Sequence, residues 1–176
     1  MMKLKLKIYL AFTVACLSVS TYANESSYIG LNFSSMDYNE ASFEEFKVST
    51  TNLVLGKSIN SRLSAEFRYG LGTFDNENEI NGVDTSVEID KMYGYYVKYA
   101  VEVNGYHPYA IVGYTNATLV GSGSNSVKMS NSDNSFGVGL RFGETESSSF
   151  NVEYMNYLDT GNASVDGFSV GLKLSF

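Results

Sequence analysis

Nine charged side chains could carry chemistry in this chain, because they recur at alternate positions among small and polar residues. They are five acids and four bases: Glu66, Glu88, Asp90, Glu102, Glu153, Arg68, Lys98, Arg141 and Lys173. Such a set can transfer protons, conduct ions, or fill an interior with salt bridges. A buried ion without a partner is strongly destabilising, so the near balance of acids and bases favours an internal ion-pair network.

Other chemistry has little support in the sequence. The single histidine, His107, precedes a proline, and no Ser–His arrangement stands out around it. Acid–base chemistry from carboxylates alone stays open, although nothing singles out a pair. The acidic stretch 75–79 offers oxygen ligands for Ca²⁺, but it lacks the glycine and closing glutamate of an EF-hand. We therefore expect no catalytic residue, no metal site and no cofactor.

Alternation of apolar and polar residues predicts β-strands that would position the nine charges. In the clearest case, from Leu63 to Leu71, every second residue is apolar and Glu66 and Arg68 lie between. Seven further segments follow the same rule, starting near positions 28, 52, 87, 109, 136, 150 and 168. In a strand, this period places the apolar set on one face and the charged set on the other. From residue 87 to residue 101 we expect the alternation to continue without a break, so that every second residue lies on the same face.

Eight strands joined alternately by short and long connections indicate a closed barrel. Short turns are expected at 60–61, 104–105 and 144–148, and long polar loops at 36–44, 74–84, 120–134 and 158–164. Inside lipid every backbone polar group must be paired within the protein, and a sheet achieves this only by closing. We predict an all-β, eight-stranded antiparallel up-and-down transmembrane β-barrel, with the apolar face toward lipid and the charges in the lumen.

The first 23 residues are predicted to be a signal peptide, and residues 24–176 the barrel domain. Three lysines precede an apolar run at 8–19, and we expect cleavage between Ala23 and Asn24. A lipid-modified Cys16 is an alternative, although the residues before it fit a lipoprotein site poorly. Loss of the three lysines would change the formal charge from −7 to −10, which argues against nucleic acid as a partner.

A soluble β-sandwich or lipocalin-like barrel is the rival fold, in which the apolar face would point inward. The charged face, however, also carries glycines at 70, 72, 137, 139 and 171. Small residues beside charges make a poor solvent face, but they suit the narrow lumen of an eight-stranded barrel. The membrane barrel is therefore the preferred interpretation.

The last eight residues, SVGLKLSF, end on an aromatic side chain. Ser169, Gly171, Leu174 and Phe176 fill the places of the C-terminal assembly signal of outer-membrane proteins, which this segment resembles. The stretch HPYAIVGY at 107–114 resembles the Pro-Tyr-x-x-x-Gly-Tyr strand start of small eight-stranded barrels, a group that includes the OmpA transmembrane domain, OmpX and opacity-type surface proteins. The resemblance implies a bacterial outer-membrane protein with periplasmic termini. Its implied partners are the barrel-assembly machinery, outer-membrane lipid and lipopolysaccharide.

The expected role is structural or surface-interacting (adhesion-like), without enzymatic activity. An eight-stranded barrel is only wide enough inside for side chains, which favours a filled lumen. Two alternatives stay open: a narrow channel for ions or small apolar molecules, and an outer-membrane lipid-modifying enzyme. Aromatic side chains are expected as girdles at both membrane interfaces, and Lys91 is expected to reach toward lipopolysaccharide. The sequence indicates no extracellular ligand.

Overall fold

The computed structural model describes residues 27–40, 46–74, 76–80, 83–122, 127–143, 145, 147–161 and 163–176. Nine antiparallel strands form one sheet: β1 (Ser27–Glu40), β2 (Phe46–Ser58), β3 (Leu63–Phe74), β4 (Asn76–Ile80), β5 (Val83–Ala100), β6 (His107–Ser122), β7 (Val127–Phe142), β8 (Ser148–Asp159) and β9 (Ala163–Ser175). In these ranges no helix has the length and apolar character needed to span a membrane. The expected cleavage site at Ala23 and Asn24, and Cys16, lie outside the described residues.

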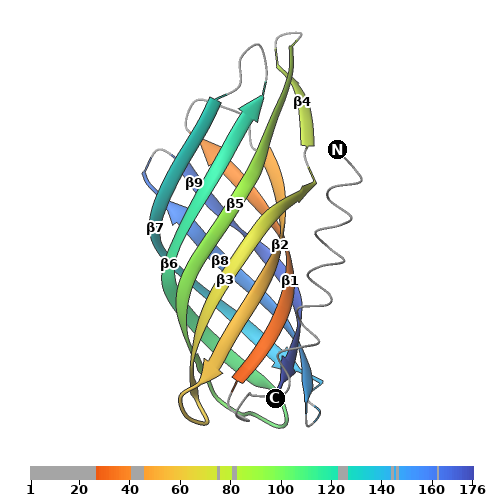
Figure 1. The fold of residues 1–176 in the computed structure, drawn as a ribbon, viewed down its shortest axis with the longest axis vertical. Helices are drawn as coiled ribbons and strands as arrows, with labels where there is room; N and C mark the ends of the chain where they lie inside the picture. The colour runs from red at the N-terminus through yellow and green to blue at the C-terminus, as the bar shows by residue number, and fades with distance from the viewer. Residues whose placement is uncertain are drawn as a thin grey trace.

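Eight of the strands close into a barrel, as predicted (Figure 1). β1 pairs with β2 on one side and with β9 on the other, and the ring is completed where β3 pairs with β5. Closure gives each barrel strand a paired neighbour on both sides, which is how a sheet removes its edges. Toward the loop end the β7–β8 ladder stops at Phe136 and Asn156, so residues 127–135 of β7 pair only with β6. The ninth strand, β4, pairs only with Val83–Val87 at the start of β5 and extends the wall beyond β3.

The two ends of the barrel differ in their connections. We call one the turn end: it holds the connections 58–63, 100–107 and 142–148, and there β1 begins and β9 ends, at the bottom of Figure 1. Asn104 and Gly105 have positive φ angles of 52° and 78°, as a two-residue hairpin turn requires. We call the opposite end the loop end, where β1, β3, β6 and β8 end and β2, β5, β7 and β9 begin.

The strands run further toward the loop end than the sequence predicts. The expected loop at 120–134 is mostly strand, because residues 127–134 begin β7 and pair with 114–121 of β6. Similarly, β1 continues to Glu40 and pairs there with Ala163 of β9. These segments are polar enough to resemble loops, but they are strands, and many of their polar side chains, such as Asp37, Lys128 and Ser132, lie on the outer face of the sheet.

The outward face changes character along the barrel. Nearer the turn end it is an apolar zone, which we call the band: Ile29, Leu31, Phe33, Leu55, Phe67, Tyr95, Val112, Phe136, Val152, Phe168 and Val170. Nearer the loop end it is polar: Ser35, Asp37, Asn39, Lys47, Ser49, Lys91, Asn116, Lys128, Ser132, Asn156 and Asp166. We call this loop-end part of the barrel the collar. Two tyrosines mark the boundary, since Tyr114 donates to Ser132 Oγ at 2.8 Å and Tyr154 to Asp166 Oδ2 at 2.6 Å.

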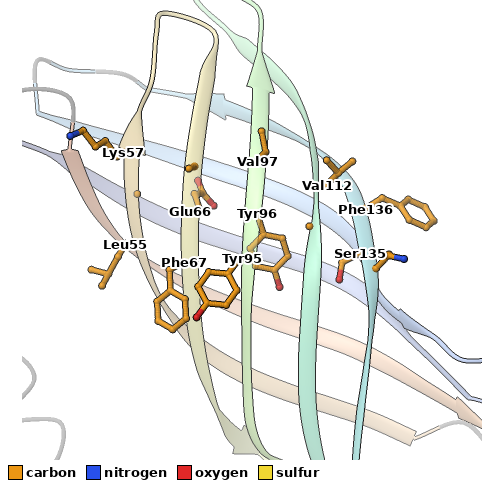
Figure 2. A pocket seen from close by; sticks show the side chains of 14 residues that line it. Leu55, Lys57, Glu66, Phe67, Tyr95, Tyr96, Val97, Val112, Ser135 and Phe136 are labelled. Atoms are coloured by element: carbon orange, nitrogen blue, oxygen red, sulfur yellow. The ribbon is translucent and has the colours of Figure 1, made fainter.

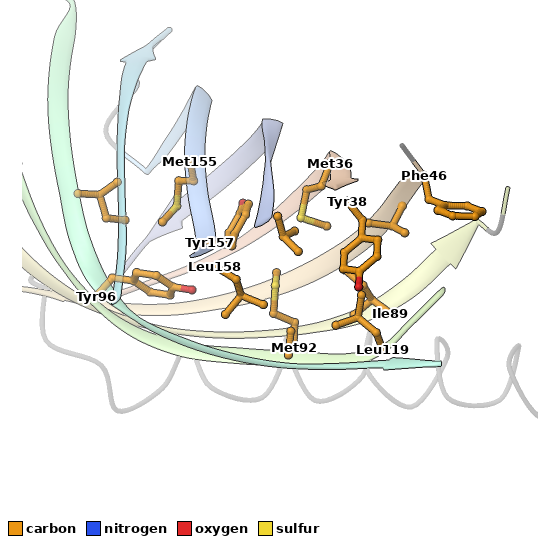
Figure 3. Close-up of a cluster of buried hydrophobic side chains, with 14 of the residues drawn as sticks. Met36, Tyr38, Phe46, Ile89, Met92, Tyr96, Leu119, Met155, Tyr157 and Leu158 are labelled. Carbon is orange, nitrogen blue, oxygen red and sulfur yellow. The ribbon is translucent and has the colours of Figure 1, made fainter. Parts of the chain in front are cut away.

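The inward face changes in the opposite sense. Inside the collar lies a buried apolar core, seen in Figure 3: Met36, Tyr38, Phe46, Val48, Ile89, Met92, Leu119, Met155, Tyr157, Leu158 and Val165. Inside the band most of the buried side chains are polar, among them Asn32, Asn52, Glu66, Arg68 and Glu153, and the apolar Val54 and Ile111 are buried beside them. The prediction of a polar lumen is therefore wrong for the collar. Where the outer face is polar, the hydrophobic effect drives apolar side chains inward, as in a soluble barrel.

Candidate functional site in the lumen

A pair of charged side chains spans the lumen inside the band. Arg68 projects from β3 and Glu153 from β8, and these strands lie opposite each other because three strands separate them in either direction. Arg68 Nη1 donates to Glu153 Oε1 at 2.5 Å, and Nη2 donates to Oε2 at 3.0 Å. This bidentate contact connects opposite walls of the barrel and fixes the relative orientation of the guanidinium and the carboxylate.

A second carboxylate binds the same guanidinium from β3 itself. Arg68 donates to Glu66 Oε2 from Nε at 2.9 Å and from Nη2 at 2.6 Å. Lys98 of β5 forms an ion pair with Glu66 Oε1. The two acids and two bases are all at most 13% exposed, and their charges balance. The attraction between these balanced charges offsets the free energy that is needed to remove the ions from water.

Three tyrosines complete the cluster, and sequence reasoning assigned none of them to it. Tyr28 donates to Glu66 Oε1 at 2.7 Å, and Tyr109 donates to Glu153 Oε2 at 2.9 Å. The ring of Tyr96 lies beneath the Arg68 guanidinium, with Cζ 4.9 Å from the ring centroid. Every carboxylate oxygen of Glu66 and Glu153 therefore has a donor. We call the seven residues (Tyr28, Glu66, Arg68, Tyr96, Lys98, Tyr109 and Glu153) the lumen cluster.

Two glycines make room for these tyrosines. Gly56 lies opposite Tyr28 in the β1–β2 register, and a Cβ atom at that position would clash with the tyrosine ring. Gly139 has the same relation to Tyr109 across the β6–β7 register. The signal for the cluster was thus present in the sequence as inward Tyr and Gly, but the pairing becomes visible only once the register is known.

Neutral hydrogen-bonded groups lie between parts of the lumen cluster and the collar core, although Arg68 Nη1 also contacts Met155 Sδ of the core directly at 3.5 Å. Tyr96 Oη and Thr115 Oγ1 are 2.7 Å apart, and Thr115 Oγ1 and Ser135 Oγ are 2.6 Å apart. On the other side of the lumen, Asn52 Nδ2 donates to Ser34 Oγ at 3.0 Å. The lumen therefore changes from mainly ionic and polar side chains to mainly apolar ones as it approaches the loop end.

Two small cavities lie in the lumen on the turn-end side. One, of about 20 Å³, is lined by Arg68, Lys98, Arg141 and Lys173 among others, and one, of about 30 Å³, lies beside Tyr109. Cavities of this size hold one or two water molecules. Arg141 and Lys173 line this end of the lumen, and Lys173 Nζ lies 4.7 Å from the centroid of the Tyr28 ring.

Three of the nine predicted lumen charges lie elsewhere. A bulge in β5 between Ile89 and Lys91 reverses the alternation, so Ile89 is buried and Asp90 faces outward. Glu88 lies on the outer face for the same reason, since it alternates with inward-facing neighbours. Glu102 is exposed in the turn that follows β5. The expectation of one unbroken parity along this strand is wrong, because one inserted residue reverses it.

The other candidate groups do not join the lumen cluster. His107 is half-buried at the start of β6, at the turn end. Asp75 lies outside the described residues, and the rest of the acidic stretch belongs to β4. Across the described ranges, no group of three His, Cys, Asp or Glu side chains is placed to hold a metal ion.

The residues of the predicted assembly signal occupy the last strand. Ser169 is buried on the inward face, and Leu174 is exposed on the outward face. Gly171 lies inward, opposite Asn32 of β1 and Asn151 of β8. Phe176 follows β9, and its backbone N–H donates to the carbonyl of Ser27 at 3.0 Å. The final residue therefore extends the pairing between the first and last strands.

A family model described as outer membrane protein beta-barrel domain matches residues 9–176. Among solved structures, the chain is similar to Ail, the attachment invasion locus protein of Yersinia pestis, with a TM-score of 0.63 at 16% identity over 85% of this chain and 97% of Ail. Ail in complex with the heparin analogue sucrose octasulfate gives a TM-score of 0.61 at 17% identity over 85% and 97%. Neisserial surface protein A gives 0.64 at 14% identity over 86% and 97%. No curated protein matches significantly.

Proposed function

The chain belongs to the outer membrane protein beta-barrel domain family, and from this premise we propose that it is a closed surface barrel of the bacterial outer membrane. The band is the part surrounded by lipid, and the collar stands above it. The proposed role is structural or adhesion-like contact through the loop end. One observation carries the proposal: the lumen is occupied at two levels, by the lumen cluster inside the band and by the apolar core inside the collar.

Recording from planar bilayers tests the closed lumen. Purified protein should give no stable openings, because the Arg68–Glu153 contact crosses the lumen and apolar side chains fill the collar. A porin reconstituted in parallel provides the positive control. Stable openings from the purified barrel would instead favour the alternative of a narrow channel for ions or small apolar molecules.

The proposed orientation places the turn end in the periplasm and the loop end outside the cell. Short turns on the periplasmic side and longer loops on the outer side are typical of these barrels. A membrane-impermeant maleimide applied to intact cells should label Thr160→Cys, at the loop end, and should leave Glu102→Cys, at the turn end, unlabelled. Both positions are exposed, so access to the reagent is the only difference between them. Labelling of Glu102→Cys alone would reverse the orientation.

The proposed surface contact differs in charge from the one recorded for Ail. Ail was solved with a heparin analogue, a polyanion. On the described collar, acids outnumber the three lysines: Asp37, Glu40, Glu88, Asp90, Asp159 and Asp166 against Lys47, Lys91 and Lys128. We therefore propose a neutral or basic partner. Attachment of cells to protein-coated surfaces should increase with this protein and should not be competed by heparin. Equal attachment of cells with and without the protein would contradict the proposed adhesion-like role.

Assembly is proposed to depend on Ser169, Gly171, Leu174 and Phe176, as the signal read by the barrel-assembly machinery. Phe176→Ser should lower the amount of folded protein in the outer membrane, and Lys173→Gln in the same strand serves as the control. Outer-membrane levels equal to those of the unmodified protein would argue against the signal.

The proposal includes no enzymatic activity, and lipid A provides the test. The alternative of a lipid-modifying enzyme predicts a change in the lipid A mass spectrum between cells with and without the protein. We expect identical spectra.

A further inference from the structure

A shallow groove crosses the outward face of β2, β3, β5, β6 and β7 within the band (Figure 2). Its floor follows a single row of cross-strand partners, in which each residue lies directly opposite the next. The row runs Lys57, Ala65, Val97, Val112 and Phe136. Because the row follows the hydrogen-bonding direction of a tilted sheet, the groove climbs obliquely around the barrel from Lys57 at its turn-end side.

The groove arises from a step in side-chain size between two neighbouring rows. The floor residues Ala65, Val97 and Val112 are small, whereas the next row toward the loop end contains Leu55, Phe67 and Tyr95. Phe67 and Tyr95 pack with ring centroids 5.1 Å apart and form a continuous wall. The resulting groove has a volume of about 990 Å³, and its lining is mostly apolar.

The dimensions of the groove suit an extended hydrocarbon chain. Its floor spans four interstrand spacings of about 4.8 Å, which gives a length of roughly 19 Å. Phe136, 61% exposed, stands at the far end. The band around the groove is convex, so a groove lined by small side chains is the feature that could favour one bound chain over the surrounding lipid.

The charge at the groove points to the headgroup. Lys57 is exposed at the turn-end extremity of the row, and it is the one cation among the residues that line the groove. The carboxylate of Glu66, also on the lining, faces the lumen and is held by Arg68 and Lys98. A lysine near the membrane surface attracts anionic lipid.

We propose that this groove binds one acyl chain of an anionic glycerophospholipid, whose phosphate contacts Lys57. The bound lipid would occupy the leaflet nearer the turn end. The inference goes beyond the proposed surface role, because it concerns the lipid-facing band and does not depend on any contact made by the loop end.

Native mass spectrometry of the purified, folded barrel tests the lipid site. After incubation with phosphatidylglycerol or phosphatidylethanolamine, the unmodified protein should retain one phosphatidylglycerol in preference. Lys57→Gln should weaken retention of phosphatidylglycerol about fivefold, which is the contribution of one lysine near a membrane surface. Retention of phosphatidylethanolamine should stay unchanged. Lys47→Gln provides the matched control, since Lys47 lies on the outward face of the same strand but in the collar.

Filling the groove gives a second, steric test. Val97→Phe should abolish retention of the lipid. Val170→Phe should not, because Val170 is an equally outward valine on β9, the strand opposite β5. The heat-dependent mobility shift on SDS gels confirms that each variant is folded. Equal retention of both lipids, or unchanged retention in Lys57→Gln and Val97→Phe, would overturn the proposal. A dimer that Val97→Phe disrupts would also overturn it, because a second copy of the chain would then be the occupant.

Discussion

The band and the collar are built from the same strands, yet they bury opposite kinds of side chain. On β1, Leu31 and Phe33 face outward in the band while Asn32 and Ser34 are buried. Three residues further along, Met36 and Tyr38 are buried and Asp37 faces outward. The backbone pairing is continuous through this change, so the sheet itself has no preference for either face. The comparison shows that the medium surrounding each part of the barrel decides which face of the sheet is apolar in that part.

Ion pairs provide a second contrast between the two parts. Inside the band, Arg68 lies between two buried carboxylates, whereas Lys128 and Asp90 pair at 2.7 Å on the exposed outer surface of the collar. The distances are similar, but the surroundings differ. Removing one buried partner leaves a charge without water, whereas removing an exposed partner leaves a charge that water solvates.

The largest effect is expected from breaking the lumen cluster. Arg68→Ala leaves Glu66 and Glu153 buried without their shared cation, and it should lower the free energy of unfolding by about 3–5 kcal/mol. Urea titration in lipid vesicles, followed by circular dichroism, measures this change. As the control, replacing Glu66 and Glu153 by Gln together with Arg68 and Lys98 by Met removes all four charges and should have a smaller effect. An equal loss in both variants would show that packing, and not charge, holds this level of the barrel.

A somewhat smaller effect is expected from opening the collar core. Met36 is fully buried, so Met36→Ala should lower the free energy of unfolding by about 2–5 kcal/mol through lost burial and the cavity left behind. Its outward neighbour provides the matched control, since Ser35→Ala should stay within about 0.5 kcal/mol. If both variants were equally stable in the same urea titration, the collar would not contain a packed core.

The outer faces of the two parts can be compared with one new charge in each. Val170→Lys places an ammonium group against lipid in the band and should cost about 2–4 kcal/mol if this position lies near the middle of the membrane. Asn39→Lys, on the outward face of the collar, should change the free energy of unfolding by no more than about 0.5 kcal/mol. Similar losses at the two positions would place both in the same medium and contradict the division.

The smallest effect is expected from the exposed ion pair. Asp90→Asn removes the contact with Lys128 and should lower the free energy of unfolding by at most about 1 kcal/mol. The difference should shrink as salt is added, because exposed charges are screened. A loss as large as that of Arg68→Ala would mean that this pair is buried by a partner.

Prediction from the sequence succeeded where alternation continued without interruption. The strand with Glu66 and Arg68 carries an unbroken pattern, and both charges lie in the lumen. Prediction failed at Asp90 because a bulge inserts one residue and reverses the alternation of faces. No single residue type at this point predicts the bulge. Prediction also failed for 127–134, because a strand rich in polar residues has the same composition as a loop.

The sequence by itself determined the closed barrel, its eight membrane-facing strands and the apolar character of the band, because a period of two and the rule that lipid-embedded backbone must be paired leave few other solutions. Tertiary structure alone decided which charges meet. Arg68 and Glu153 are far apart in the chain and come together only because ring closure places β3 opposite β8. The tertiary structure also decided where the collar begins. The position along the barrel axis at which the outward face becomes polar depends on how the strands are staggered against one another.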